Sequence, residues 1–372
     1  MVEGHSVHRV ATLHRQRLVG KCFRATSPNG RFTEGAKVID GKVFYRIEAV
    51  GKNLFAFFRD SDATDEKDAV VVHVHFGMAG NWAVYEGEEA FPEPTSTNRL
   101  RLEHLTVPLT ADLSAMTVNH GGLDLYIEKR QKLGQDPLRE DADSELLWSK
   151  VKASKKSIGA LIMDQSFFTG PGNIYRAEIL FKAGIHPDKK GQELEKHEFD
   201  LIWHHTVALL QRGFQTGSIL TVDPEEAKLL GKPKLRRYIY NCSNCPRCKT
   251  RIQTWTIASR TCYACPKCQS IKSKAHNKVE KTNCIPFNSH CARKPVESRL
   301  VESGPTRLTV KEIKGQLAKL GIKSVPKNLK KAGLAELLLA EQAKKIVSSE
   351  DAAAEKAAAQ ESLAVEHVAE LA

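Results

Sequence analysis

Leu161-Ile-Met-Asp-Gln-Ser-Phe-Phe-Thr-Gly-Pro-Gly-Asn-Ile-Tyr-Arg-Ala-Glu-Ile-Leu-Phe181 places two apolar runs on either side of a turn. The spacing predicts one helix over residues 157–163 and a second over 173–183, which Gly184 can cap. The intervening Phe168-Thr-Gly-Pro-Gly172 cannot continue a helix, because proline lacks a backbone N–H and glycine is a poor helix former. Free N–H groups at the start of the second helix could bind a phosphate. Most Gly-Pro-Gly segments are only turns, so this feature needs support from the rest of the chain.

Residues 1–130 carry a helical pattern followed by short β-strand patterns, and the region therefore predicts an α+β fold. The clearest strand patterns cover residues 42–50, 53–58 and 70–76. From about residue 136 the pattern becomes helical, and it includes a third helix at roughly 198–212.

The positive charge of the chain is concentrated in one segment. The 372 residues include 56 Lys and Arg against 44 Asp and Glu, for a net charge of +12. Residues 232–281 alone hold 13 Lys and Arg and a single acid, Glu280. A localised excess of this kind indicates a surface that binds a polyanion. The 41% hydrophobic content excludes collagen-like, mucin-like and wholly disordered chains.

Six of the nine cysteines lie within residues 242–268, inside the basic segment. The pairs Cys245/Cys248 and Cys265/Cys268 have the spacing of a zinc ribbon, in which four thiolates surround the ion as a tetrahedron. We therefore expect one structural Zn²⁺.

Two alternatives for metal binding remain open. Cys242/Cys245 with Cys262/Cys265 has the same internal spacing, although only the first set places both pairs in Cys-Pro-x-Cys. A second metal group is conceivable at His276, Cys284, His290 and Cys291.

The amino terminus has no apolar signal-peptide core, and no run of 18 apolar residues predicts a membrane span. We expect a reduced intracellular compartment without membrane association. This would be the nucleus if the source is eukaryotic, and otherwise the cytoplasm with its nucleoid.

Five motifs, in this order along the chain, resemble those of the formamidopyrimidine-DNA glycosylase/endonuclease VIII family. They are Met1-Val-Glu-Gly-His5, Val50-Gly-Lys-Asn-Leu-Phe55, His75-Phe-Gly-Met-Ala-Gly80, residues 161–181, and Ser259-Arg-Thr-Cys-Tyr-Ala-Cys-Pro-Lys-Cys-Gln269. The resemblance covers residues 1 to about 270. It implies an α+β multidomain protein that contains an amino-terminal β-sandwich with flanking helices, a helix–two-turn–helix domain and a zinc-ribbon finger.

The resemblance and the composition together divide the chain into six parts. They are a catalytic β-sandwich domain (1–130), a helix–two-turn–helix DNA-binding domain (136–236), a zinc finger (237–272), a basic linker (273–305), a helical module (306–345) and an Ala/Glu-rich tail (346–372). The module 306–345 loosely resembles a SAP-type DNA-binding unit, and a basic helical hairpin packed on the main body explains it equally well.

The family resemblance implies that Val2, once Met1 is removed, is the nucleophile and that Glu3 transfers protons. An α-amino group has a pKa near 7.7–8.0, so a useful fraction of it is neutral at pH 7, unlike an ordinary lysine. Such an amine can attack C1′ of a damaged nucleotide, expel the base and form a Schiff base, after which elimination cuts the strand. Lys52 matches a lysine that contacts phosphate and assists the acid catalysis.

The resemblance also implies the DNA contacts. Met78 matches a methionine that fills the space left by a flipped base. Asn173 and Arg260 match residues that bind phosphates near the lesion, and Tyr175 supports the same loop. The expected partner is damaged double-stranded or single-stranded DNA, bound by a monomer.

Two departures from the family pattern bear on activity. The family's usual proline is Val2 here, and this predicts strand cleavage that is weaker than base excision. The stretch around Val118-Asn-His-Gly-Gly-Leu-Asp-Leu125 lacks the Asp-Pro-Arg-Arg-Phe-Gly loop that supplies two further wedge residues in the formamidopyrimidine branch. Both this absence and Gly4-His5 favour the endonuclease VIII branch, with oxidised pyrimidines or hydantoins as substrates.

A second hypothesis is a non-catalytic damaged-DNA or chromatin-binding protein on the same scaffold. Glu3, Lys52 and Met78 favour the enzyme, whereas Val2 favours the binding protein. A zinc-ribbon transcription factor would leave the first 230 residues unexplained.

Overall fold

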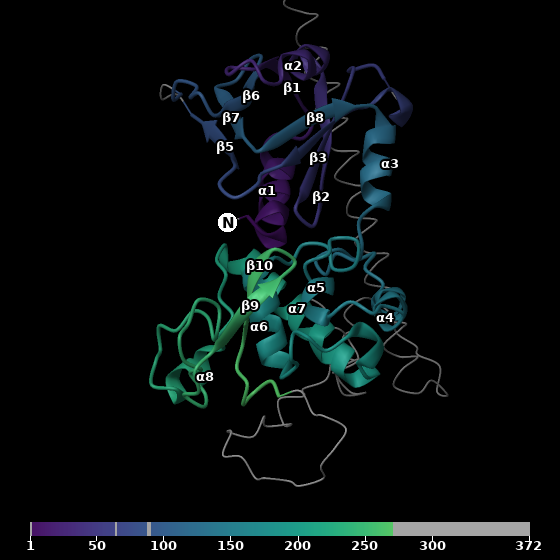
Figure 1. Ribbon diagram of the computed structural model, residues 1–372. Helices are drawn as coiled ribbons and strands as arrows, with labels where there is room; N and C mark the ends of the chain where they lie inside the picture. Colours follow the sequence, from purple (N-terminus) through teal and green to yellow (C-terminus); the bar gives the residue numbers. More distant parts are fainter. Residues whose placement is uncertain (1, 64, 88–90, 271–372) are drawn as a thin grey trace, which may run out of the picture. The chain divides into compact units, whose positions relative to one another are not determined.

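The computed structural model describes residues 2–63, 65–87 and 91–270, all within the first of two compact units, residues 1–286. The amino-terminal helix α1 (Gly4–Arg17) precedes a β-sandwich that contains eight strands (Figure 1). These strands are β1 (Lys21–Thr26), β2 (Val43–Val50), β3 (Asn53–Arg59), β4 (Val70–His75), β5 (Asn81–Glu86), β6 (Asn98–His104), β7 (Leu109–Ser114) and β8 (Thr117–Gly121).

The strand order β5-β7-β6-β1-β2-β3-β4-β8 is antiparallel throughout, and β1 passes from one layer of the sandwich to the other. Lys21 and Cys22 pair with β2, whereas the following four residues pair with β6. Apolar side chains from both layers and from α1 form one core, in which Phe44 and Phe58 stack at 4.7 Å between ring centroids. Burying one such side chain contributes about 1.5–3 kcal/mol.

Short helices border the sandwich. They are α2 (Thr33–Ile39), the 3₁₀ turn η1 (Glu66–Asp68) and α3 (Leu123–Gln131). Tyr126 of α3 packs on Phe55 and Phe57 and thus covers the outer face of β3.

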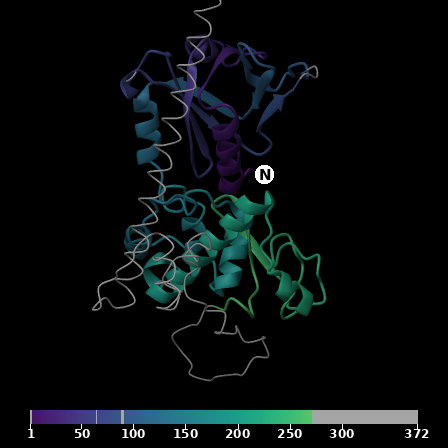
Figure 2. The same cartoon turned by 180° about the vertical axis from the view of Figure 1, so that it is seen from behind.

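The helical part follows a linker that begins near residue 132. It comprises α4 (Ser144–Lys152), α5 (Ile158–Leu161), α6 (Asn173–Ala183), η2 (Gly191–Glu193), α7 (Lys196–Thr216) and α8 (Pro224–Leu229). Helix α6 has the predicted bounds exactly and ends at Gly184 in the left-handed conformation (φ 70°). The helix expected over 157–163 is shorter, since it already ends at Leu161. Figure 2 shows the same elements from behind.

The hairpin of β9 (Gln253–Ile257) and β10 (Arg260–Ala264) packs beside α6. Its tight turn places Ala258 and Ser259 at positive φ (52° and 57°). Hydrophobic residues before the hairpin, including Tyr238 and Ile239, share a core with Phe181 of α6. The cysteine-rich segment is thus integrated with the helical part.

Among the described residues, no helix combines the length and apolarity that a membrane crossing needs. The predicted linker, SAP-like module and tail lie outside the described residues. So does the alternative metal group at His276, Cys284, His290 and Cys291.

Candidate active site

Glu3 lies at the first turn of α1, directly after Val2. The Ser6 hydroxyl accepts a hydrogen bond from the Glu3 N–H (3.2 Å) and donates one to the Glu3 carbonyl (2.7 Å), which fixes the backbone at this helix start. Val2 is half-buried and packs against the sandwich core. The nucleophile and the proton carrier that the sequence predicts are therefore held at one rigid helix end.

The Glu3 carboxylate is fully buried at the start of α1. Its counter-charge is the Lys52 ammonium, whose Nζ lies 3.6 Å from Oε2. Burial raises the pKa of Glu3 to about 7, and the positive charge of Lys52 opposes that rise. A carboxyl group with this pKa can both give and take a proton near neutral pH.

Four glycines allow the backbone to close around this carboxylate. A Cβ on Gly172, the residue immediately before α6, would collide with the Glu3 carboxylate oxygens. A Cβ on Gly4 would lie 2.8 Å from the Gly170 Cα, and the Gly4 N–H donates to the Gly170 carbonyl (3.0 Å). Gly51 has φ 58° and meets Gly170 from the β2–β3 turn. The Gly-Pro-Gly segment therefore forms one wall of the Glu3 site.

Lys52 follows Gly51 in the two-residue turn that joins Val50 to Asn53. This turn places Lys52 beside Glu3, although about fifty residues separate the two in the sequence. The Lys52 side chain is 20% exposed. The position fits the predicted role, because a partly exposed ammonium beside the carboxylate can also reach a phosphate.

Met78 and Met116 are exposed at 64% and 60%, which is unusual for methionine. The turns that carry them adjoin: the Met116 N–H donates to the Phe76 carbonyl (3.3 Å), and a Cβ on Gly77 would contact the Met116 side chain. Arg99 donates to the Met116 carbonyl (2.8 Å) and steadies this turn.

Met116 is not among the predicted site residues. The sequence predicts the wedge-loop position around residues 118–125, but that stretch forms β8 and the start of α3. The turn beside Met78 instead contains Ala115 and Met116. A lone methionine between two strand patterns carries no sequence signal of its own.

The start of α6 and the β9–β10 hairpin are joined by buried polar groups. The Asn173 side-chain amide donates to the Thr261 carbonyl (3.0 Å), and its oxygen accepts from Arg176. The fully buried Arg176 also donates to the carbonyls of Ile257 (3.0 Å) and Thr261 (3.1 Å). Arg260 is exposed on the same hairpin. Arg176 is not among the predicted site residues. It fixes the position of Asn173 relative to the hairpin that carries Arg260.

Tyr175 is buried, and its hydroxyl lies 3.1 Å from Nδ1 of His5 on α1. A Cβ on Gly213 of α7 would collide with that hydroxyl. Tyr175 therefore connects three helices near Glu3, in agreement with a supporting role rather than a direct DNA contact.

The sulfurs of Cys245, Cys248, Cys265 and Cys268 lie within 4.8 Å of one another. Cys242 and Cys262, which the alternative pairing would require, are not in this group. The fold therefore brings together the two Cys-Pro-x-Cys pairs as a candidate metal site.

Comparison with known proteins gives two domain matches. Residues 1–119 match the formamidopyrimidine-DNA glycosylase N-terminal domain, and residues 133–223 match the formamidopyrimidine-DNA glycosylase H2TH domain. A protein named endonuclease 8 1, from Mycobacterium tuberculosis, is 35% identical over 280 residues, which cover 73% of this chain and all of that protein. The chain belongs to the formamidopyrimidine-DNA glycosylase/endonuclease VIII family.

Two further proteins of the family match this chain at lower identity. The formamidopyrimidine-DNA glycosylase of Legionella pneumophila strain Paris is 29% identical over 218 residues, covering 55% of this chain and 76% of that protein. A Lactococcus lactis family structure with abasic-site DNA superimposes with a TM-score of 0.58 at 22% identity, over 72% of this chain and all of that chain. The predicted architecture of sandwich, helix–two-turn–helix part and cysteine finger is therefore confirmed as the family fold.

Proposed function

We propose that this protein is a base-excision-repair DNA glycosylase that also cleaves the strand at the resulting abasic site. The observation that carries the proposal is the buried Glu3 carboxyl, with a pKa raised to about 7, between the Val2 position and Lys52. Burying an ionised carboxylate costs free energy, and buried acids with raised pKa values are typical of catalytic sites.

The reaction uses the Val2 amine after removal of Met1. The neutral amine forms a bond to C1′ as the bond from C1′ to the damaged base breaks, and the base leaves with a proton. Opening of the sugar ring then gives a protonated imine on Val2, with Glu3 as the group that supplies and receives protons. Loss of a C2′ proton expels the 3′ phosphate, and hydrolysis of the imine frees the enzyme.

Val2 makes this imine differ from that of an amino-terminal proline. A secondary amine gives an iminium that is always cationic, whereas the imine of Val2 must be protonated to withdraw electrons. We expect base excision to exceed strand cleavage for this reason.

Damaged DNA is the proposed partner, bound by a monomer. Met78 and Met116 would enter the duplex at the site of the flipped base, because both are exposed, apolar and adjacent. Asn173 and Arg260 would bind the phosphates beside it, supported by Tyr175.

The double variant in which alanine replaces both Met78 and Met116 should bind a lesion duplex more weakly than either single variant. Fluorescence anisotropy measures this binding.

The four-cysteine group would hold one structural Zn²⁺. Four thiolates at this spacing suit zinc, and they surround it without leaving a position for a reacting water. Its contribution is to keep the hairpin with Arg260 folded.

The 35% identity to a protein named endonuclease 8 1 supports the endonuclease VIII branch and, with it, oxidised pyrimidines or hydantoins as substrates. We expect the protein to act where its DNA lies, in the nucleus of a eukaryote or the nucleoid of a bacterium.

An excision assay on thymine-glycol and hydantoin duplexes tests this function against the alternative of a non-catalytic binding protein, which Val2 favours. The wild-type protein should release the damaged base, and Glu3→Gln should reduce that release by at least about a hundredfold. DNA binding without base release by the wild type would instead support the alternative, and equal release by both proteins would remove Glu3 from the mechanism.

A further inference from the structure

We infer that Asp136, held by His8, is a positioning residue that clamps the element carrying Lys52 to the element carrying Glu3. The inference rests on the proposed function, because it assigns a role at the same site. Asp136 lies in the linker before α4, is buried, and lies outside the five sequence motifs that carry the family resemblance.

The Asp136 carboxylate accepts from three separate parts of the chain. Oδ2 lies 2.7 Å from Nε2 of His8 on α1 and 2.6 Å from the backbone N of Gly51. Oδ1 accepts from the Leu138 N–H (3.0 Å), which fixes the carboxylate to its own loop. A buried carboxylate with this many donors is held in one orientation.

The two outer contacts reach the two elements of the active site. His8 lies on α1, the helix whose first turn carries Glu3. Gly51 immediately precedes Lys52 in the β2–β3 turn, and its left-handed backbone presents its N–H to Asp136. Asp136 therefore binds both elements that set the separation of 3.6 Å between Lys52 Nζ and Glu3 Oε2.

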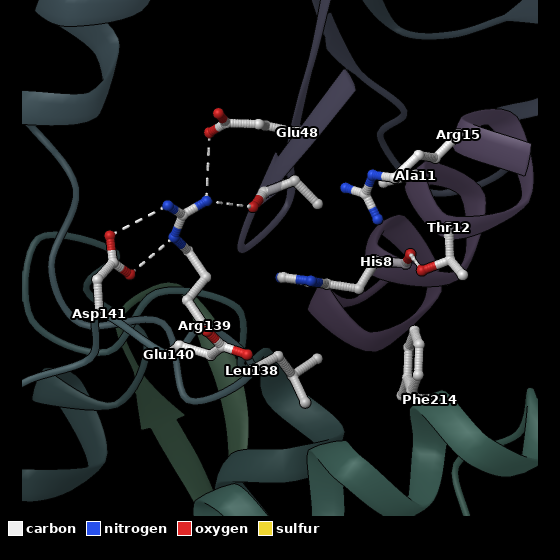
Figure 3. Close-up of a pocket in the computed structure, with 11 residues that line it drawn as sticks. His8, Ala11, Thr12, Arg15, Glu48, Leu138, Arg139, Glu140, Asp141 and Phe214 are labelled. Atoms are coloured by element: carbon white, nitrogen blue, oxygen red, sulfur yellow. Dashed lines mark hydrogen bonds and ion pairs between the residues drawn. The ribbon is translucent and has the colours of Figure 1, made fainter. Parts of the chain in front are cut away.

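His8 is the member of this clamp that can be changed without opening the core. Its side chain is 14% exposed and lines a cavity of about 500 Å³ together with Arg139 and Glu140. Figure 3 shows the His8 ring entering this cavity from α1, while Arg139 turns toward Asp141 and Glu48. Because Arg139 is engaged by these acids, the donor to Asp136 from the cavity side is His8.

A carboxylate suits this place better than an amide. Asn at position 136 would have one acceptor oxygen, and its NH₂ group would face either the Leu138 N–H or both the Gly51 N–H and His8. A His8 ring with a proton on Nε2 can donate to this carboxylate. Glutamine can place an amide N–H at the position of Nε2, whereas leucine fills similar volume without a donor.

The test compares the full-length wild type, His8→Leu, His8→Gln and the control Glu140→Gln, whose exposed side chain lines the same cavity. The first measurement is the pKa of the Glu3 carboxyl in DNA-free protein, followed by ¹³C NMR. Since Lys52 lowers the pKa of Glu3, loosening the clamp in His8→Leu should raise it by about 0.5 or more. His8→Gln and Glu140→Gln should stay at the wild-type value.

The second measurement is the single-turnover rate of borohydride trapping on abasic-site DNA, alongside the Kd for DNA containing a tetrahydrofuran abasic analogue. His8→Leu should form the trapped complex about tenfold more slowly than the wild type, while its Kd stays within about twofold of the wild-type value. A misplaced catalytic group slows the reaction without weakening binding. His8→Gln should recover the rate to within about twofold. Thermal melting should show all four proteins folded at the assay temperature, with His8→Leu melting lower because the buried Asp136 loses a donor.

Two results would overturn the clamp: an unchanged Glu3 pKa and trapping rate in His8→Leu, or equal changes in His8→Leu and His8→Gln. Failure of the wild type to trap any DNA would refute the proposed chemistry instead. The comparison of Glu3 pKa values would still show whether the clamp positions Lys52 in that case, because this measurement needs no reaction.

Discussion

Glu3 combines two properties that rarely coexist in a side chain kept only for stability: complete burial and a pKa raised to about 7 in spite of the neighbouring Lys52 ammonium. The folded protein binds a proton at Glu3 up to about pH 7, whereas an unfolded glutamate releases it near 4.5. Stability should therefore fall as the pH rises from 4.5 to 7 and then level off, because the ionised folded state bears the cost of burial.

Glu3→Gln removes that ionisation. We expect the variant to lose base excision and yet to exceed the wild type in free energy of unfolding above pH 7, by up to about 3 kcal/mol. Urea unfolding at pH 5 and pH 8 measures this, and the difference between the two proteins should be smaller at pH 5. A wild type that is more stable than Glu3→Gln at pH 8 would contradict the raised pKa.

Gly172→Ala tests the wall of the Glu3 site at the same scale. The added methyl group would displace the carboxylate, so excision should fall by about a hundredfold. Gly122→Ala is the matched control, since Gly122 also precedes a helix and a Cβ there meets open space. Single-turnover excision rates compare the two, and equal rates would mean that the carboxylate tolerates the shift.

At the scale of elements, the β9–β10 hairpin depends on two anchors: the buried Arg176 on α6 and the four-cysteine group. Cys265→Ser should lower the bound zinc, measured by elemental analysis, and weaken DNA binding by at least about tenfold. Cys262→Ser should leave the zinc content at the wild-type level. The reverse pattern would favour the alternative pairing of the cysteines.

Some elements could be predicted from the sequence because local chemistry defines them. Helix α6 begins after Gly172 and is capped by Gly184, so a turn-forming residue marks each of its ends in the sequence. Helix α3 was not predicted, since none of its residues is buried and it has no apolar stripe.

The same contrast holds for the active site. Val2, Glu3 and Lys52 lie in motifs with a family resemblance, so the sequence could propose their roles, and these stay predictions. The contacts of Asp136, His8 and Met116 join segments distant in the chain, and no local pattern marks such contacts.

At the scale of the whole molecule, the net charge of +12 predicts DNA binding that weakens steeply with salt. Lys249, Arg251 and Arg260 are exposed on the finger, whereas Arg247 is bound to Glu226 and packs on Phe181. Changing the three exposed residues to glutamine should reduce the slope of log K against log salt by up to about 2.7, or 0.9 per phosphate contact. Glutamine at the exposed Lys37, Lys150 and Lys155 should leave it nearly unchanged, and equal losses would argue against a localised DNA surface.

Borohydride trapping tests the central claim most directly, because it asks whether the Val2 amine forms a covalent bond to the sugar. Purified protein whose mass confirms the loss of Met1 should give a stable complex with abasic-site DNA. Peptide mapping should place the adduct on Val2, and protein that retains Met1 should give none. A processed wild-type protein that forms no complex, or an adduct on Lys52 in place of Val2, would contradict the account.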